Sequence, residues 1–286
     1  MNLIINISDL KNIDKYINKG VESFIIGLKD FNVNGNSELN INEIKGLLEN
    51  NKDIDIFISI DKFIFNSELN ILKNNLIELS SLNIKGILFY DLAILNMVKN
   101  NNLNIDLVWN GTHMVTNYNT CNYYYSKGVK YAYISSELTC DEIIEINNKS
   151  SIEPLVFILG YPNLSHTRRT LLTNFYKSNN IDGNKDYLKI TERDKSFILK
   201  ENYTGTIVLG GEVVNATKYI DILLDNNINN LVLNDYKINN DIFIKVLSYI
   251  NNYIDTKDNN NLLEIDKLIG TNTHFFNKKT IYKVKK

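Results

Sequence analysis

Short apolar segments recur along this chain, and most are followed by a segment with helical spacing. They are apolar throughout, which is typical of parallel strands that are covered on both faces of a sheet. There are eight of them: Leu3–Ile7, Ser23–Gly27, Ile54–Ile60, Gly86–Asp91, Asp106–Trp109, Tyr131–Ser135, Leu155–Leu159 and Asn230–Leu233. Eight strand–helix units in a chain of 286 residues predict a TIM-like (β/α)8 barrel of the α/β class.

The helical segments agree with this interpretation. Apolar residues at helical spacing predict helices over 42–49, 67–79, 92–98, 120–127, 139–147, 212–224 and 241–254. A doubly wound open sheet is the main alternative, but no G-x-G-x-x-G pattern follows the first strand.

The repeat is interrupted after the seventh strand. Residues 182–205 read as an irregular excursion, with a hairpin through Ser196–Leu199 and Thr206–Leu209. We therefore expect a single barrel domain over 1–258 and a C-terminal tail over 259–286 that packs on the barrel.

Composition limits the classes of function. The net charge is −2, so the chain as a whole has no excess of positive charge that would attract nucleic acid. A local basic patch could still bind it. Cys121 and Cys140 are far apart and form no C-x-x-C pair, so neither a disulfide framework nor a metal site is expected. No apolar run approaches the roughly 18 residues of a membrane span, and the N-terminus lacks the features of a signal peptide. We expect a cytoplasmic protein without a membrane partner.

An arginine pair follows the seventh strand. The strand ends near Gly160, and the chain then presents His166, Arg168 and Arg169 before a helical pattern resumes. Arginine occurs elsewhere only at Arg193, since lysine supplies the other basic side chains. A guanidinium can grip a carboxylate or a phosphate with two hydrogen bonds, so the pair indicates an anion site. Two solvated charges at the start of a helix are the simpler alternative.

The carboxyl ends of barrel strands meet on one face, where function is expected. Four segments would lie there: Asp61, Asp91, Asn110–Asn117 with His113, and the loop that carries His166, Arg168 and Arg169. Beside two arginines, His166 would favour its neutral form and could act as a donor or a base. A loop histidine can equally serve to satisfy a backbone carbonyl.

Three stretches resemble the collagenase-like peptidase family U32. Thr116–Tyr123 and Glu137–Ile143 are similar to one family segment, and the arginine loop stands where the family has a His-Gly-x-x-Cys signature. The tail Thr273–Tyr282 resembles that of short members found as paired subunits in low-GC Gram-positive bacteria and mollicutes. The resemblance implies a TIM-like barrel. Several members of the family hydroxylate the wobble uridine of tRNA with prephenate as a required metabolite.

The chain departs from the family at the cysteines. Many members hold an iron–sulfur cluster on four cysteines, whereas the signature His is Leu159 here, its Cys is Asn163, and a later Cys falls at Asn215. With Cys121 and Cys140 alone, the chain cannot supply four thiolates, so we expect no cofactor in this chain and no metal site.

The resemblance therefore implies a paired subunit whose partner is a second, cluster-bearing U32 protein, with tRNA as a further partner. It would act as part of a tRNA-modifying hydroxylase that forms 5-hydroxyuridine. Peptidase activity and a non-catalytic scaffold are the alternatives. The catalytic candidates are Asp91 and His166, and the substrate-binding candidates are Asn117, Arg168, Arg169, Asn174 and Arg193. Of these, Asp91, Arg168, Arg169 and Asn174 match the family pattern.

Overall fold

A closed barrel of eight parallel strands forms the body of the protein. The computed structural model describes residues 1–34, 37–184, 187–192 and 195–278. The barrel strands follow one another in chain order: β1 (Asn2–Asn6), β2 (Ser23–Leu28), β4 (Asp55–Ile60), β5 (Gly86–Phe89), β6 (Leu107–Trp109), β7 (Tyr131–Tyr133), β8 (Glu153–Gly160) and β14 (Asn230–Asn234). Strand β1 pairs in parallel with both β2 and β14, which closes the barrel. The TIM-like fold expected from the sequence is confirmed.

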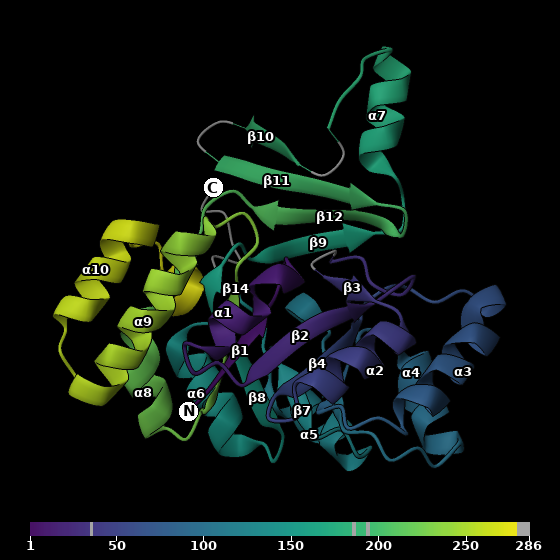
Figure 1. Cartoon of the computed structure of the whole chain (residues 1–286), viewed down its shortest axis with the longest axis horizontal. Helices are drawn as coiled ribbons and strands as arrows, with labels where there is room; N and C mark the ends of the chain where they lie inside the picture. The colour runs from purple at the N-terminus through teal and green to yellow at the C-terminus, as the bar shows by residue number, and fades with distance from the viewer. Residues whose placement is uncertain (35–36, 185–186, 193–194, 279–286) are drawn as a thin grey trace, which may run out of the picture.

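Helices surround the barrel (Figure 1). They are α1 (Ile13–Ile17), α2 (Ile41–Asn50), α3 (Leu69–Leu79), α4 (Leu92–Asn100), α5 (Tyr118–Ser126), α6 (Cys140–Lys149), α8 (Ile220–Asp225), α9 (Asn240–Thr256) and α10 (Asn260–Ile269). Side-chain caps begin several of them: Asn40 and Thr139, for example, form capping boxes with Glu43 and Glu142. Helix α10 lies in the predicted tail and packs on α9, with Ile265 buried.

The core of the barrel has two layers. Inside the barrel, each of the eight strands contributes one residue to a single cluster: Ile4, Ile25, Phe57, Leu88, Val108, Tyr131, Leu155 and Val232. A larger cluster lies between the outer face of the strands and the helices. Because these side chains fill the interior, the barrel is a packed core, and a ligand can enter only at its ends.

A second sheet covers the carboxyl ends of the barrel strands (Figure 1). It consists of four antiparallel strands in the order β10 (Leu188–Glu192), β11 (Lys195–Asn202), β12 (Gly205–Gly210) and β9 (Asn163–Thr167), and we call it the lid sheet. Helix α7 (Leu171–Asn179) lies between β9 and β10 in the chain and projects from the lid sheet. The predicted hairpin is confirmed as β11 and β12.

Hydrogen bonds fix the lid sheet to the barrel. The Thr204 hydroxyl donates to the Asn32 carbonyl oxygen at 2.5 Å, and the Asn202 amide donates to Glu38 at 3.2 Å. The Tyr203 hydroxyl accepts from the Asp30 amide at 3.0 Å. The turn between β11 and β12 is therefore held on the loop that follows β2.

Two parts of the predicted element pattern differ from the structure. Residues 163–167 were expected in a loop after the seventh strand, but they form β9 because β12 pairs with them. The helix expected over 212–224 is divided: β13 (Val214–Asn215) pairs with β8, and α8 starts only at Ile220. In both cases a long-range strand pairing overrides the local pattern.

Gly160 allows the chain to leave the barrel for the lid. Its φ is +127°, and a Cβ there would lie 2.6 Å from the Asn234 carbonyl oxygen. Only glycine fits this conformation and this approach. None of the helices in the described part of the chain is long and apolar enough to cross a membrane.

Candidate functional site

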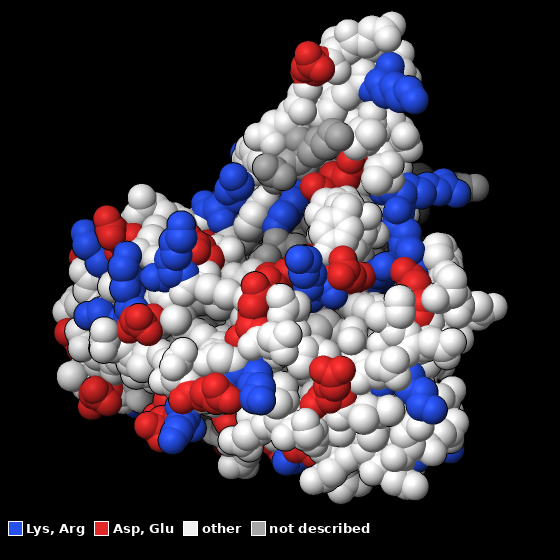
Figure 2. Space-filling model, turned by 45° about the vertical axis from the view of Figure 1, so that its right-hand side comes forward, with Lys and Arg blue, Asp and Glu red and all other residues white. Residues whose placement is uncertain are grey.

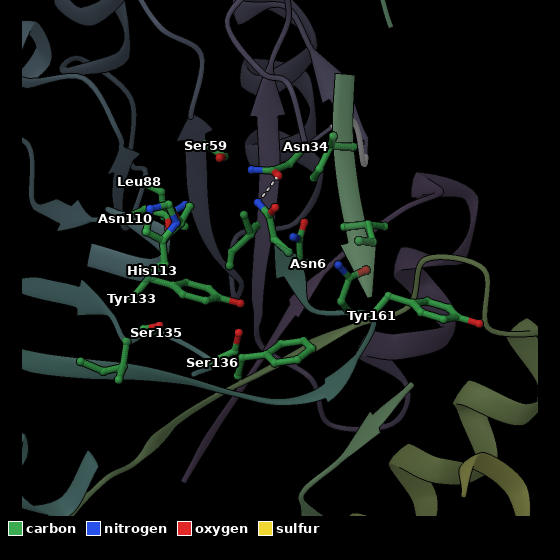
Figure 3. A pocket seen from close by; sticks show the side chains of 18 of the residues that line it. Asn6, Asn34, Ser59, Leu88, Asn110, His113, Tyr133, Ser135, Ser136 and Tyr161 are labelled. Carbon is green, nitrogen blue, oxygen red and sulfur yellow. Dashed lines mark hydrogen bonds between the residues drawn. The ribbon is translucent and has the colours of Figure 1, made fainter. Parts of the chain in front are cut away.

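A cavity lies at the barrel mouth beneath the lid sheet (Figure 3). Its volume is about 80 Å³, which is room for several water molecules or one small ligand. Polar residues from the ends of barrel strands and the loops after them form much of its wall: Asn6, Asn34, Ser59, Asn110, Thr112, His113, Tyr133, Ser135, Ser136, Glu137 and Asn234. The lid side contributes Tyr161, Asn163, Ile207 and Leu209. The cavity is thus where the (β/α)8 fold is expected to carry its site.

Some polar groups in this wall make no hydrogen bond to another described residue, among them the side chains of Asn110 and Tyr133 and the Oδ1 of Asn163. Asn110 is buried, and its side-chain amide has no such partner. The ring of Tyr133 extends into the cavity, and its hydroxyl is also unpartnered within the described chain (Figure 3). Asn163 donates its amide to the Asn34 side chain at 2.8 Å, which leaves its buried Oδ1 without a donor. Burial raises the pKa of Tyr133 above its usual range, so this hydroxyl keeps its proton.

His166 lies on strand β9 of the lid sheet, and its ring contacts residues of the barrel. It lies opposite Ile207 in the β9–β12 register, and Ile207 lines the cavity. The imidazole stacks on Phe63, with ring centroids 5.0 Å apart, and meets Tyr90 edge-on at 4.7 Å. Burial, together with the nearby His113, lowers the pKa of His166 to about 4. The imidazole is therefore neutral at pH 7, as expected from the sequence, but burial is the cause rather than the two arginines.

The Nε2 atom of His166 is buried and has no hydrogen-bond partner among the described residues. A buried nitrogen without a partner costs free energy, and such atoms concentrate at functional sites. His113, the second mouth histidine, lines the cavity, and its Nδ1 is 3.2 Å from the Thr112 hydroxyl.

Arg168 is engaged by the barrel. Its guanidinium donates two hydrogen bonds to Glu68, at 2.9 and 3.2 Å, and one to the Phe63 carbonyl oxygen at 2.9 Å. It also stacks on the Phe65 ring, with Cζ 3.5 Å from the ring centroid. Lys62 pairs with the same carboxylate at 2.5 Å. Arg168 thus ties the end of β9 to the loop after β4, and its guanidinium is engaged by Glu68.

The pKa of Glu68 reflects this network. Burial alone would raise it, but hydrogen bonds from Lys62, the Phe65 amide and Arg168 lower it to about 2. The carboxylate is therefore ionised at any physiological pH, and the lid contact is a permanent ion pair.

The other predicted binding residues are dispersed. Arg169 is exposed, and its side chain forms no hydrogen bond or ion pair with another described residue. Asn174 is exposed on α7, outside the cavity wall. Asn117 caps α5 by accepting from the Thr120 amide and hydroxyl. Arg193 lies outside the described residues.

Asp91, a predicted catalytic residue, has a structural position. Its carboxylate accepts from the Ala93 amide, which caps α4, and from the Ile64 amide in the loop after β4. Both carboxylate oxygens are used in this way, and Asp91 does not line the cavity.

Asp61 is buried directly after β4, beside Ser59 of the cavity wall. It accepts from the Val33 amide at 2.7 Å and lies 3.5 Å from the Ser59 hydroxyl. Burial raises its pKa to about 6. Its main role is to shape the loop after β2, from which Asn34 enters the cavity wall.

Several wall residues were missed by the sequence reasoning, above all the asparagines Asn6, Asn34, Asn163 and Asn234. Asn6 and Asn234 are the last residues of β1 and β14, so a polar residue at the end of an apolar strand was the available signal. In an asparagine-rich chain that signal is weak.

Asn163 and Asn215, where the resemblance led us to expect family cysteines, have other tasks here. Asn215 donates to Asp266 and to the Gly270 carbonyl oxygen, which fastens the C-terminal segment to β13. Asn163 belongs to the cavity wall. Cys121 and Cys140 are buried on α5 and α6, and burial raises the pKa of each thiol to about 11. The described residues contain no cluster of three or more His, Cys, Asp or Glu that could hold a metal ion.

The fold and the mouth cavity define a (β/α)8-barrel protein with an antiparallel lid and a polar, ligand-sized site. The model of peptidase family U32 matches residues 8–280, and the chain belongs to that family. This confirms the resemblance seen in the sequence.

A curated relative is more specific. The chain is 22% identical over 233 residues to a protein of Bacillus subtilis (strain 168) named tRNA hydroxylation protein P2, with 78% of this chain and 75% of that protein covered. Among solved structures, a glycoside hydrolase family 18 N-acetylglucosaminidase from Paenibacillus barengoltzii covers 82% of this chain and 94% of its own at 9% identity and a TM-score of 0.40. A member of the enolase superfamily from Listeria innocua covers 76% and 58% at 11% identity, also with a TM-score of 0.40. These structural likenesses are too weak to bear on function.

Proposed function

We propose that this U32 protein is a component of tRNA wobble-uridine hydroxylation, in which it binds substrate at the barrel mouth. The observation that carries the proposal is the family match over 8–280 combined with the relative named tRNA hydroxylation protein P2. The polar cavity supports it, since it offers hydrogen-bonding groups at the place where a barrel enzyme binds substrate.

The proposal divides the arginine pair. Arg168 is a positioning residue, because its guanidinium is occupied by Glu68. Arg169 is exposed and available, so we assign to it the contact with an anion at the rim, either an RNA phosphate or a carboxylate of a metabolite such as prephenate. Figure 2 shows basic and acidic side chains interspersed where the upper lobe, which carries the lid, meets the barrel body.

Redox chemistry in this proposal belongs to a second, cluster-bearing U32 subunit. The chain has two cysteines, which cannot supply the four thiolates that such a cluster uses. The chain's own residues would bind and orient the substrate, and the lid sheet would shield it from water.

Peptidase activity, the alternative, has less support. A cysteine nucleophile requires a thiolate, and burial raises the pKa of both thiols to about 11. Ser59, Ser135 and Ser136 line the cavity, but among the described contacts none donates a hydrogen bond to His113 or His166.

The test is mass spectrometry of tRNA nucleosides from cells that lack the gene. We expect 5-hydroxyuridine and its derivatives to disappear and to return when the gene is restored. Complementation with Arg169→Ala should restore the modification poorly, whereas Lys127→Ala, at the far end of α5, should restore it fully. Unchanged nucleosides in the deletion strain would refute the proposal.

A further inference from the structure

The charge of the mouth cavity restricts what it can bind. Glu137 is the acidic member of the wall, and the described residues that line it include no lysine or arginine. The buried Asp61 lies 3.5 Å from Ser59 of the wall, and His166 is neutral at pH 7. Among the described wall residues, a carboxylate or phosphate would lose its hydration without meeting a lysine or arginine. The cavity therefore suits an uncharged ligand, and the anion contact belongs outside it.

The unpartnered groups describe the ligand further. Asn110 offers both a carbonyl oxygen and an NH₂ group, Tyr133 offers a hydroxyl, and Asn163 offers its Oδ1 as an acceptor. The hydrogen bond to Asn34 fixes the orientation of the Asn163 amide, so the acceptor direction is set in advance. A matching ligand carries hydrogen-bond donors and acceptors close together on its edge.

Apolar side chains accompany these groups. Phe157 lines the same cavity, and Ile207 and Leu209 of β12 face it from the lid, whereas the ring of Tyr161 extends away from the other wall residues (Figure 3). A planar ring can pack between such side chains while its edge meets the polar groups. Proteins that act on a base take it out of the strand and hold it in this manner, by hydrogen bonds to its edge and by stacking.

We propose that the mouth cavity binds an uncharged nucleobase, turned out of an RNA strand, through Asn110, Tyr133 and Asn163. This inference rests on the proposed function and deepens it by naming the residues that hold the base and by placing the anionic groups of the ligand outside the cavity. The base enters the cavity, while the phosphate backbone stays at the rim near Arg169.

Binding of free nucleosides to the purified full-length chain tests the inference. Uridine, cytidine and adenosine would be compared with succinate, a dianion of small size, by ligand-observed NMR at millimolar concentrations. We expect at least one nucleoside to bind with an affinity that is the same at 50 and 500 mM salt, because no charge is involved. Succinate should not compete with it.

Tyr133→Phe removes one hydroxyl and keeps the ring. Because the hydroxyl would lose its bond to the base, we expect the affinity for the nucleoside to fall about tenfold. Asn110→Ala should act in the same direction. Tyr125→Phe is the matched control, since Tyr125 is exposed on α5 and does not line the cavity, and its affinity should equal that of the wild type. Circular dichroism shows whether each variant is folded.

The inference is overturned if no nucleoside binds, if binding is unaffected by both cavity variants, or if succinate displaces the nucleoside. Its failure is distinct from failure of the proposed function. Loss of 5-hydroxyuridine in the deletion strain without nucleoside binding would leave the function standing and remove the base pocket. Intact tRNA modification with nucleoside binding would do the reverse.

Discussion

At the scale of single residues, the two neighbouring arginines have different surroundings. Arg168 has a bidentate partner in Glu68 and a ring beneath it, and its side chain is 23% exposed. Arg169 is exposed and has no described partner. Sequence alone treats them as a pair, because nothing local reveals that a carboxylate one hundred residues away selects one of them.

Replacing each arginine by alanine separates stability from function. We expect Arg168→Ala to lower the free energy of unfolding by roughly 1–2 kcal/mol, because a partly buried ion pair and its hydrogen bonds are lost. Arg169→Ala should leave stability within about 0.5 kcal/mol and reduce tRNA modification. Urea denaturation of the two variants measures the first effect, and nucleoside analysis the second. Equal stabilities for the two variants would contradict this assignment.

Asp61 makes stability depend on pH. Its pKa is about 6 in the folded chain and about 3.9 in the unfolded chain, so the folded state keeps a proton that the unfolded state releases. The contribution of Asp61 to stability is therefore greatest below about pH 4 and declines as the pH rises to about 7. His166, whose pKa is lowered, acts in the opposite direction over this window.

The difference between wild type and Asp61→Asn isolates this contribution. Urea denaturation at pH 4.5 and at pH 7 should show the wild type losing roughly 2 kcal/mol relative to the variant on going to pH 7. Asp182→Asn, at an exposed position, is the control and should track the wild type. Parallel behaviour of Asp61→Asn and wild type would show that Asp61 does not retain its proton.

At the scale of elements, helix α7 depends on a residue from the lid sheet. The side chain of Thr170, its N-cap residue, forms no capping hydrogen bond. Instead the buried Glu201 of β11 accepts from the Leu172 and Thr173 amides and from the Thr173 hydroxyl. A carboxylate at a helix N-terminus satisfies free amides and complements the helix dipole.

Glu201→Ala should therefore loosen α7. We expect amide hydrogen exchange over residues 171–176 to accelerate at least tenfold, since the amides of the first turn lose a buried acceptor. Glu78→Ala, at an exposed position of α3, should leave exchange in α7 unchanged. Exchange at the wild-type rate in Glu201→Ala would mean that packing alone holds the helix.

The sequence predicts the barrel elements far better than the lid. All eight barrel strands were expected in order, because each is a continuous apolar run that its helices cover. Strand β9 was missed because its segment, Asn163–Thr167, is polar and pairs with β12 about forty residues later. The mouth was expected to carry the site, and Asn110 and His113 do line the cavity. The capping roles of Asp91 and Asn117 depend on local geometry that residue identity does not reveal.

At the scale of the whole molecule, stability should reside in the barrel interior. The cluster that takes one residue from each strand includes Phe57, which is 1% exposed and meets Tyr131 edge-on at 6.0 Å. Removing this ring leaves a cavity that eight fixed strands cannot close.

We expect Phe57→Ala to lower the free energy of unfolding by about 3–5 kcal/mol. Phe175→Ala removes the same ring from α7, where it is 50% exposed, and should cost less than about 1 kcal/mol. Urea denaturation followed by circular dichroism compares the two. Similar losses would imply that the barrel relaxes around the missing ring.

The parallel pairing of β1 with β14 has a consequence for biosynthesis. Residues 2–6 leave the ribosome long before residues 230–234, which form one of their two neighbouring strands. Strand β1 therefore keeps one unpaired edge until β14 has been translated. The strands of the lid sheet, within residues 163–210, are translated before β14. The lid segment is therefore complete before the barrel can close.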